Sequence, residues 1–199
     1  MTLFRRSLIL VPILLCIGGR ARGSEVSLSI NPDGKGGYAI SSIFWVQGPV
    51  SLIWGVLTDY EHLVYIVPSL RTSEVVQRDQ NYLLLKQEGI ARVLGVFHFS
   101  AQVLLKVQTE PKERIVFEDT AHKSFVFYKG EWKLSPASGG GVWVEYALKA
   151  KPIAEAPSFI TKGAFLRTAQ QLLDSVQAEI ERRRPPCVVV MTPCTSNEP

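Results

Sequence analysis

In the first two thirds of this chain of 199 residues, a single long helical stretch interrupts an otherwise strand-like sequence and limits the folds available to it. Residues 49–70 read PVSLIWGVLTDYEHLVYIVPSL. Pro49 suits a first helical turn, where its missing N–H removes no hydrogen bond. The apolar positions follow the spacing of one helical face: Val50, Ile53, Trp54 and Leu57. Because strand-like sequence lies on both sides, we expect short helices that lie across a sheet.

A second helix start follows the first helix directly. The residues Thr58-Asp59-Tyr60-Glu61 match a capping box, in which the first and fourth side chains accept hydrogen bonds from each other's backbone N–H groups. Pro68 lacks a backbone donor and ends this second helix. The capping box accounts for Asp59 and Glu61 without a reaction. The alternative is that these two carboxylates form an acid–base pair.

The rest of the chain consists mainly of strand-like stretches joined by short turns. Alternation of polar and apolar residues indicates strands at 25–30, 38–47, 71–78, 82–91, 97–108, 113–119, 125–134 and 142–150. Consecutive strands with short turns form an antiparallel meander, and its apolar face needs a cover. We expect a curved antiparallel sheet of about seven strands.

The last long segment can supply this cover. Residues 157–184 read as one helix, with three arginines at its C-terminal end and Pro185-Pro186 beyond it. Its apolar stripe comprises Phe165, Leu166, Ala169, Leu172, Leu173, Val176 and Ile180. The sequence therefore predicts an α+β fold in which the sheet wraps around a long C-terminal helix, with two short helices after the first long strand.

The N-terminal segment has the features of a secretory signal peptide. Arg5 and Arg6 precede an apolar run over residues 7–17, and Ala21-Arg22-Gly23 supplies small residues before Ser24. We expect cleavage after Gly23, a domain over residues 24–184 and a periplasmic or secreted protein. The alternative is an uncleaved segment that anchors the chain to the inner membrane.

Cleavage would change the charge of the protein. The full chain has 22 basic and 18 acidic residues, and the segment 1–23 holds four of the arginines and no acid. The remaining chain has 18 of each and no net charge with neutral histidine. Nucleic-acid binding needs an excess of clustered lysine and arginine, so we predict no nucleic-acid partner.

Two cysteines lie in a C-terminal tail over residues 185–199, which we expect to be flexible and outside the fold. Cys187 and Cys194 form an even pair in a chain expected to be exported, which favours a disulfide. The alternative is two free thiols. No histidine or carboxylate cluster accompanies them, so we predict no metal and no cofactor.

Several of these segments resemble the START-like helix-grip superfamily (SRPBCC). Trp54, the run Leu57-Thr58-Asp59-Tyr60-Glu61, Pro68 and Leu70 resemble its opening motif, and residues 129–134, 146–152 and 157–160 resemble its late strands and the start of its last helix. The most similar branch contains polyketide cyclases and coenzyme-Q-binding proteins. The resemblance covers roughly residues 24–184. It implies an apolar ligand cavity between the sheet and the long helix.

This implied cavity makes a set of apolar and aromatic residues candidates for ligand contact. They are Trp54, Tyr60, Phe97, Phe99, Phe117, Tyr128, Trp132, Tyr146, Phe165, Leu166 and Ala169. The hydroxyls of Tyr60, Tyr128, Tyr146 and Ser42 are candidates for orienting a ligand. The alternative is that the same side chains form a closely packed core.

The sequence contains no recognised catalytic signature such as G-x-S-x-G, H-E-x-x-H or a P-loop, and we predict no catalytic residue. We expect His62, His98 and His122 at the surface or in a turn; the alternative for His62 is a general base at the cavity mouth. Glu118 and Asp119 end a strand, where we expect both to be solvated.

The resulting hypothesis is an exported binding protein that encloses a lipid, an isoprenoid quinone or a polyketide-like compound. One alternative is a cyclase or dehydratase, so enzymatic activity stays open; another is a non-catalytic interaction protein with a filled core.

Trp143 alternates away from the core face, which suits either a transient contact with a membrane surface or protein, or a partly covered surface position. The sequence does not predict the oligomeric state.

Overall fold

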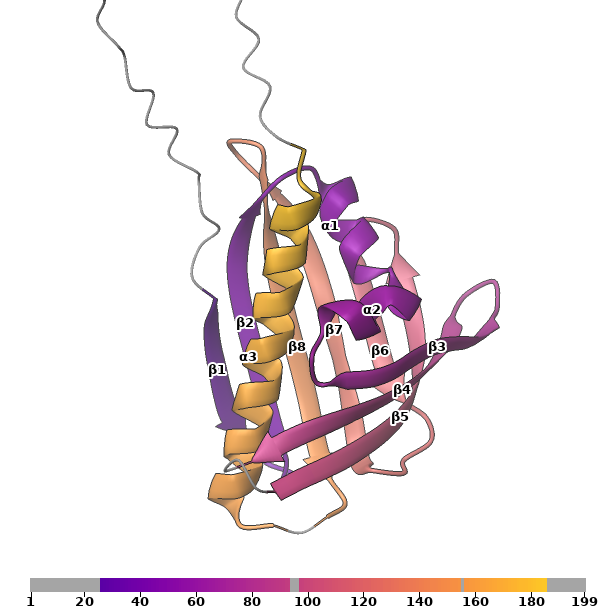
Figure 1. The fold of residues 1–199 in the computed structure, drawn as a ribbon, viewed down its shortest axis with the longest axis vertical. Coiled ribbons are helices and arrows are strands. Elements are labelled where there is room, and N and C mark those ends of the chain that lie inside the picture. The colour runs from indigo at the N-terminus through magenta and orange to yellow at the C-terminus, as the bar shows by residue number, and fades with distance from the viewer. Residues whose placement is uncertain (1–25, 94–96, 155, 186–199) are drawn as a thin grey trace, which may run out of the picture.

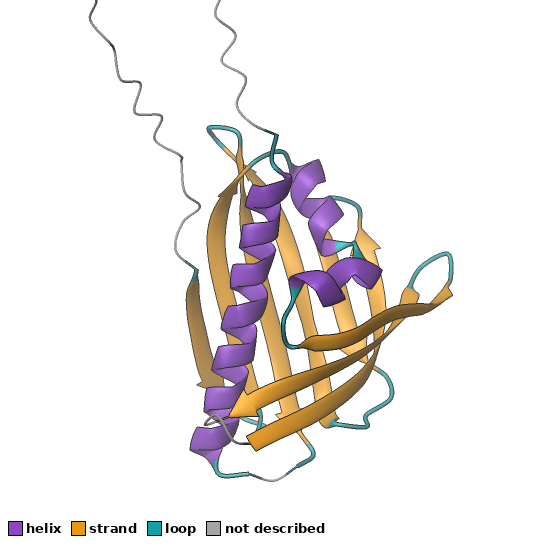
Figure 2. Ribbon diagram, viewed as in Figure 1, coloured by secondary structure: helices purple, strands orange, loops and turns teal. Residues whose placement is uncertain are grey.

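In the computed structural model, which describes residues 26–93, 97–154 and 156–185, a long helix lies across one face of a strongly curved sheet (Figure 1). The short helices lie on the same face, and the curved sheet continues past them at one side (Figure 2). This is the α+β helix-grip architecture that the sequence predicts. All apolar faces therefore meet in one interior between sheet and helices.

The sheet has eight antiparallel strands within the described residues, one more than the predicted number of about seven. Their order across the sheet is β1-β2-β8-β7-β6-β5-β4-β3, so β2 and β8 join the N-terminal hairpin to the later meander. The strands are β1 (Ser27–Pro32), β2 (Tyr38–Gln47), β3 (Leu70–Arg78), β4 (Leu83–Val93), β5 (Phe97–Glu110), β6 (Arg114–Asp119), β7 (Phe125–Ala137) and β8 (Gly141–Pro152).

The helices are α1 (Val50–Leu57), the 3-10 helix η1 (Tyr60–His62), α2 (Leu63–Ile66) and α3 (Ser158–Arg183). The predicted capping box at Thr58 is wrong. The Thr58 hydroxyl donates to the Trp54 carbonyl at 2.8 Å, and η1 begins after Asp59 without a side-chain cap. Thr58 therefore closes the end of α1, while the Asp59 carboxylate binds the side chains of His62 in η1 and Arg183 in α3.

The helix α3 packs against the core most closely along its C-terminal half. Leu173, Val176 and Ile180 are almost completely buried, as are Ile53 and Val56 of α1. In the N-terminal half of α3, Phe165 and Leu166 are only half-buried. The space between α3 and the sheet is therefore filled by side chains at one end of the helix and less completely at the other.

A buried carboxylate holds the turn after β6, contrary to the prediction that Asp119 is solvated. Asp119 is 1% exposed. Its Oδ1 accepts the backbone N–H groups of Leu104 (2.9 Å) and Ala121 (3.1 Å), and its Oδ2 accepts that of His122 (3.1 Å). These bonds replace the water that a carboxylate loses on burial. Glu118, one residue earlier, is exposed and pairs with Lys129 at 3.6 Å.

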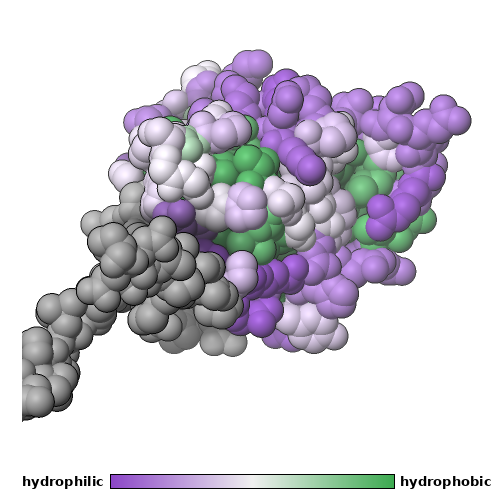
Figure 3. All heavy atoms as spheres, turned by 90° about the horizontal axis from the view of Figure 1, so that it is seen from above, coloured by the Kyte–Doolittle hydropathy of each residue, from purple (hydrophilic) through white to green (hydrophobic). Residues whose placement is uncertain are grey.

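The surface carries scattered apolar side chains. Seen from above, the end of the molecule shows mostly polar residues with apolar areas among them (Figure 3). Trp143 is 43% exposed on β8, directly opposite Trp45 of β2. None of the helices in the described ranges is both long and apolar enough to cross a lipid bilayer.

Candidate functional site

A cavity of about 330 Å³ lies between the sheet and α3. Its walls come from the end of α1, η1, α2, the strands β3 to β8 and the part of α3 between Ile160 and Val176. The volume falls in the range of roughly 300–1,000 Å³ that small-molecule sites occupy. The interior is therefore incompletely filled by side chains of the described residues, as a ligand site requires.

Strand alternation explains why the walls are apolar. Along β5, every second residue faces the cavity. These residues are Phe99, Ala101, Val103, Leu105 and Val107. This is the face that the alternation in the sequence predicts. The same period on β4 directs Leu85, Gln87 and Gly89 inward. Side chains from widely separated parts of the chain thus form one continuous apolar wall.

Small residues leave the space open. Gly89 of β4 lies opposite Ala101 of β5, so at this position the two adjacent strands present only one methyl group to the interior. On α3, Ala164 and Ala169 face the same space. Protein interiors are normally filled to crystal-like density, and the three alanines would need larger side chains to reach it. A Cβ at Gly89 would already meet the Ser69 carbonyl oxygen at 3.2 Å.

The Tyr60 hydroxyl is an unpaired polar group in the wall of this cavity. The residue is 8% exposed, and among the described residues its hydroxyl is the one buried side-chain N or O atom without a hydrogen-bond partner. Burial raises the pKa of Tyr60 to about 12, although the nearby Arg78 opposes this rise. Tyr60 is therefore a neutral donor at physiological pH. Burying such a hydroxyl unpaired costs about 1–3 kcal/mol, and a ligand oxygen would remove that cost.

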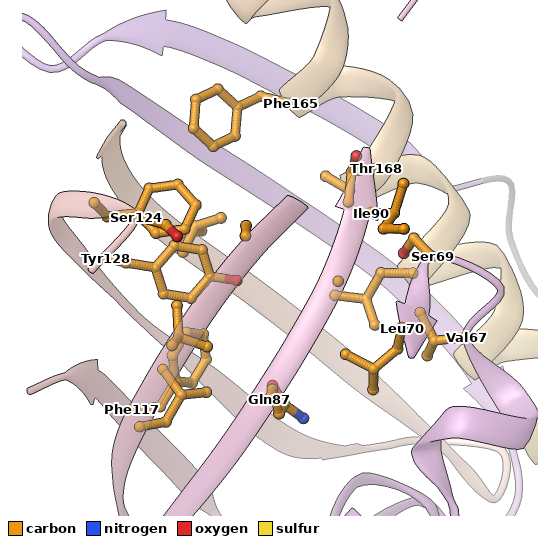
Figure 4. A pocket seen from close by; sticks show the side chains of 18 of the residues that line it. Val67, Ser69, Leu70, Gln87, Ile90, Phe117, Ser124, Tyr128, Phe165 and Thr168 are labelled. Carbon is orange, nitrogen blue, oxygen red and sulfur yellow. The ribbon is translucent and has the colours of Figure 1, made fainter. Parts of the chain in front are cut away.

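Two further tyrosines face the interior from neighbouring strands. The Tyr128 hydroxyl points into the cavity, away from the strand that carries it (Figure 4). Burial, with a smaller effect of the Asp119 charge, raises the pKa of Tyr128 to about 12. The pKa of Tyr146 is raised well above its ordinary value by burial and then by Tyr128, and its ring packs on Trp132 with centroids 4.5 Å apart. Both hydroxyls are therefore protonated donors at physiological pH.

The structure brings most of the predicted contact residues to the cavity wall. Those that line it are Tyr60, Phe99, Phe117, Tyr128, Trp132, Tyr146, Phe165 and Ala169. Trp54 and Leu166 are half-buried and do not belong to the wall, because their helices direct them to the side of it. The Ser42 hydroxyl donates to the Ser27 carbonyl at 2.8 Å and also lies outside the wall.

Several predicted positions lie beyond what the structure describes. The side chain of Phe97 is outside the described part of β5, and so is that of His98. Cys187 and Cys194 fall in residues 186–199, which are outside the described residues, as is the predicted signal peptide over residues 1–23. The predicted disulfide and the cleavage after Gly23 stay predictions.

Sequence analysis missed several polar residues of the wall, among them Gln87, Ser69 and Thr168. The alternation along β4 could have indicated Gln87, because it is a polar residue on the inward face of this strand between Leu85 and Gly89. Its Nε2 donates to the Ser73 hydroxyl at 3.0 Å. Ser69 and Thr168 had no such signal, since a loop and a helix bring them together only in the folded chain.

The Asp59 carboxylate near the cavity is held by two side-chain partners. Asp59 accepts from Arg183 of α3 at 2.8 Å and pairs with His62 at 2.6 Å, and it does not line the cavity. The hydrogen bond from Arg183, then that from His62, lowers the pKa of Asp59. Glu61 is exposed. This geometry favours a structural role for Asp59 over the alternative of an acid–base pair with Glu61.

The sequence matches the family model described as "Polyketide cyclase / dehydrase and lipid transport" over residues 46–177. The chain belongs to this family. The match spans the short helices, the strands β3 to β8 and most of α3, which are the elements that enclose the cavity. Membership in the polyketide cyclase and lipid transport family agrees with the START-like resemblance of the sequence. A comparison with curated proteins finds no match.

Solved structures of this superfamily share the fold at low sequence identity. The Zhui aromatase/cyclase from a Streptomyces species is 18% identical, with a TM-score of 0.61 over 73% of this chain and 94% of that one. Human StAR-related lipid transfer protein 5 is 12% identical, with a TM-score of 0.65 over 81% and 84%. A START superfamily protein from Mycobacterium smegmatis is 15% identical, with a TM-score of 0.59 over 72% and 97%. At these identities the likeness establishes the fold alone.

Proposed function

We propose that this protein encloses a hydrophobic small molecule, such as a lipid, an isoprenoid quinone or a polyketide-like compound, between its sheet and α3. The observation that carries the proposal is an apolar cavity of about 330 Å³ with the unpaired Tyr60 hydroxyl in its wall. An apolar guest would bury the exposed walls, and each Å² removed from water contributes roughly 25 cal/mol. The names of the lipid transfer and aromatase/cyclase relatives support the same class of ligand.

The aromatic residues of the wall would make the apolar contacts, and the tyrosines would orient the guest. Tyr60, Tyr128 and Tyr146 each offer a neutral hydroxyl from a different element. A ligand oxygen within reach of one of them would accept a hydrogen bond in a site shielded from water. The preferred guest is therefore mainly apolar with a carbonyl or hydroxyl group.

Binding would take place after export. The basic and apolar N-terminal segment supports passage to the periplasm or the outside of the cell, with cleavage after Gly23. Outside the cytoplasm, a protein of this kind would carry its guest and contact a membrane surface transiently. An uncleaved segment would instead keep the same domain at the inner membrane.

A second candidate function is catalysis on a bound polyketide-like substrate, as in a cyclase or dehydratase. The observation that favours it is the pair Tyr128 and Tyr146, two protonated hydroxyl-bearing residues on neighbouring strands that both line the apolar cavity. A protonated phenol can donate a hydrogen bond to a substrate carbonyl as negative charge develops on it. Carriage alone would return the ligand unchanged, whereas catalysis would return either a cyclised isomer of the same mass with a different absorption spectrum or, after release of water, a product of lower mass.

Native mass spectrometry of the purified mature protein tests the proposal. We expect an adduct that disappears on denaturation and is recovered in an organic extract. A neutral fluorescent probe such as N-phenyl-1-naphthylamine should bind the emptied protein and be displaced by that extract. A protein that carries no adduct and binds no apolar probe would contradict the proposal and support a filled interior.

A further inference from the structure

Next to the cavity, a second hollow of about 450 Å³ is lined by apolar, polar and basic residues. It lies between the start of β3, the strand β4 and α3. Ser69, Leu70, Ile90 and Thr168 belong to the walls of both spaces. Figure 4 shows Ser69, Ile90 and Thr168 together at one side of the cavity, across from Phe117 and Tyr128. The two spaces are therefore adjacent, and these residues form their common border.

Arginine side chains supply the charged groups of the hollow beyond this border. Arg71 of β3 and Arg167 of α3 both line it, and its wall contains no acidic residue among the described ones. Both arginines are exposed. Arg71 forms no ion pair with any described residue. A guanidinium group presents a fork of N–H donors that fits the oxygens of a carboxylate or a phosphate.

A strand irregularity places Arg71 at this border. In the pairing of β3 with β4, Leu70 lies opposite Gly89 and Thr72 lies opposite Glu88, so Arg71 is an extra residue in a bulge. Bulges redirect side chains and are frequent beside functional sites. The Ile90 N–H donates to the Ser69 carbonyl at 2.8 Å, which holds the chain just before the bulge against β4.

We propose that the ligand is an amphiphile with an anionic head, whose apolar part fills the cavity while its carboxylate or phosphate binds Arg71 and Arg167. This inference rests on the proposed function and adds the charge of the ligand and the place of its head. The charged group would stay in the open hollow and keep part of its hydration, which avoids the cost of burying an ion. The apolar chain would pass the border formed by Ser69, Ile90 and Thr168.

Ligands that share a tail and differ in the head test this inference on the mature chain. Dodecanoate, dodecyl phosphate and dodecanol would each be titrated against the protein with bound N-phenyl-1-naphthylamine. The variants Arg71→Gln and Arg167→Gln remove one charge each, and Lys149→Gln removes one from an exposed position of β8 outside both hollows.

We expect the two anions to bind the wild type more tightly than dodecanol. Arg71→Gln and Arg167→Gln should each weaken anion binding about three- to ten-fold, as for partly solvated charge-assisted contacts, and leave dodecanol unchanged. Lys149→Gln should change none of the affinities, and added salt should reduce the advantage of the anions. The tighter of the two anions identifies the head as a carboxylate or a phosphate.

Three results would overturn the inference. In the first, dodecanol binds as tightly as the two anions. In the second, the arginine variants weaken the binding of dodecanol and of the anions equally. In both cases the cavity still binds apolar molecules. Inorganic phosphate could bind with the same dependence on both arginines and without competition from dodecyl phosphate, which would assign the hollow to a free ion. If no tailed ligand and no apolar probe binds the wild type, the proposed function itself fails.

Discussion

At the scale of single residues, the described part of the chain contains one buried hydroxyl without a hydrogen-bond partner and a buried carboxylate with several partners. The Tyr60 hydroxyl is buried and unpaired, although nearby hydroxyls such as that of Thr58 have partners. The Asp119 carboxylate is equally buried and accepts three backbone N–H groups. Because an unpaired buried hydroxyl is costly, the first residue suggests a ligand contact and the second a structural role.

Replacing Tyr60 by Phe should separate these roles. Tyr60→Phe removes a buried group without a bond, so the free energy of unfolding of the ligand-free protein should stay constant or rise by about 1 kcal/mol. The affinity for an oxygen-bearing apolar ligand should fall about two- to ten-fold, the value of one hydrogen bond. Urea unfolding and probe displacement measure the two effects.

The matched control is Tyr38→Phe, which removes a hydroxyl that donates to the Ser158 carbonyl at 3.1 Å. This control should lower stability by about 0.5–1.5 kcal/mol. If Tyr60→Phe destabilises the ligand-free protein more than the control does, the Tyr60 hydroxyl has a partner inside the protein.

Replacing Asp119 by Asn should destabilise the protein by about 1–3 kcal/mol, because one buried backbone N–H then faces an amide NH₂ group. The neighbouring Glu118→Gln makes the same chemical change at an exposed ion pair with Lys129, and should cost less than about 0.5 kcal/mol. Urea unfolding of both variants provides the comparison. Equal losses would mean that Asp119 is solvated, as the sequence suggested.

At the scale of elements, charged side chains connect the end of α3 to the junction between α1 and η1. Arg183 donates to Asp59 at 2.8 Å and to Glu179 at 2.6 Å, and Arg182 contacts Glu179 at 2.7 Å. Asp59 and Arg183 are 124 positions apart in the sequence. This network therefore stabilises the packing of elements that no local signal brings together.

The network predicts a loss of stability in acid. Hydrogen bonding to Arg182 and then to Arg183, partly opposed by burial, lowers the pKa of Glu179 from 4.5 to about 2. A carboxylate with a lowered folded-state pKa stabilises the protein fully above its ordinary pKa, and this contribution is lost as the pH falls from about 4.5 to about 2. Asp59, whose pKa is also lowered, contributes with the same sign.

The measurement is urea unfolding at pH 6 and pH 3. Between these values, the wild type should lose about 1–2 kcal/mol more than Glu179→Gln does, because the variant lacks the titrating group. Glu61→Gln, at an exposed position of η1, should behave like the wild type. If the wild type and Glu179→Gln showed the same pH dependence, the network would make no contribution to the stability of the fold.

The packing of α1 predicts unequal effects for two adjacent residues. Ile53 is 0% exposed, whereas Trp54 is half-buried beside the core. Ile53→Ala should cost about 2–5 kcal/mol, the range for large-to-small changes in a core. Trp54→Ala should cost less than that change, although the Trp side chain is larger. Urea unfolding of the two variants tests this order, and a reversed order would mean that α1 presents its Trp face to the sheet.

At the scale of the whole molecule, the cavity follows from how α3 meets the curved sheet. The C-terminal half of α3 packs on the core, with Leu173 and Ile180 fully buried. Its N-terminal half lies over strands that present Gly89 and Ala101. The strands β3 to β5 curve around this open half, as Figure 1 shows. The cavity is thus a consequence of where small residues face the helix.

Filling the cavity should abolish binding and preserve the fold. Ala101→Phe places a ring in the space opposite Gly89, where there is room for it, so the free energy of unfolding should change by less than about 1.5 kcal/mol. The affinity for N-phenyl-1-naphthylamine should fall at least about ten-fold, because the ring occupies the volume of the probe. Probe titration and urea unfolding measure the two quantities.

The matched control, Val126→Phe, adds a ring at a position of β7 that is 51% exposed. It should change neither binding nor stability appreciably. A strong loss of stability in Ala101→Phe, with probe binding retained, would mean that the interior is filled at this position and that the probe binds elsewhere.

Much of the architecture was predictable because local periodicity is sufficient for it. The alternation along β5 correctly indicates which residues face inward, and the apolar stripe of α3 contains the buried Ala169, Leu173, Val176 and Ile180. The capping box failed because the Thr58 hydroxyl has a competing acceptor in the Trp54 carbonyl. Asp119 was misjudged because its partners include Leu104, which only the pairing of β5 with β6 brings close.

The amino-acid order thus determines the type and inward face of most strands and helices, since these depend on neighbours a few positions away. The folded arrangement decides where the sheet and α3 separate, that Tyr60 lacks a partner within the described chain, and that Arg71 and Arg167 border the same hollow. These features depend on distances between elements far apart in the sequence. Periodicity carries no information about such distances, because a helix or strand has the same pattern whether its inward face meets a side chain or an open space.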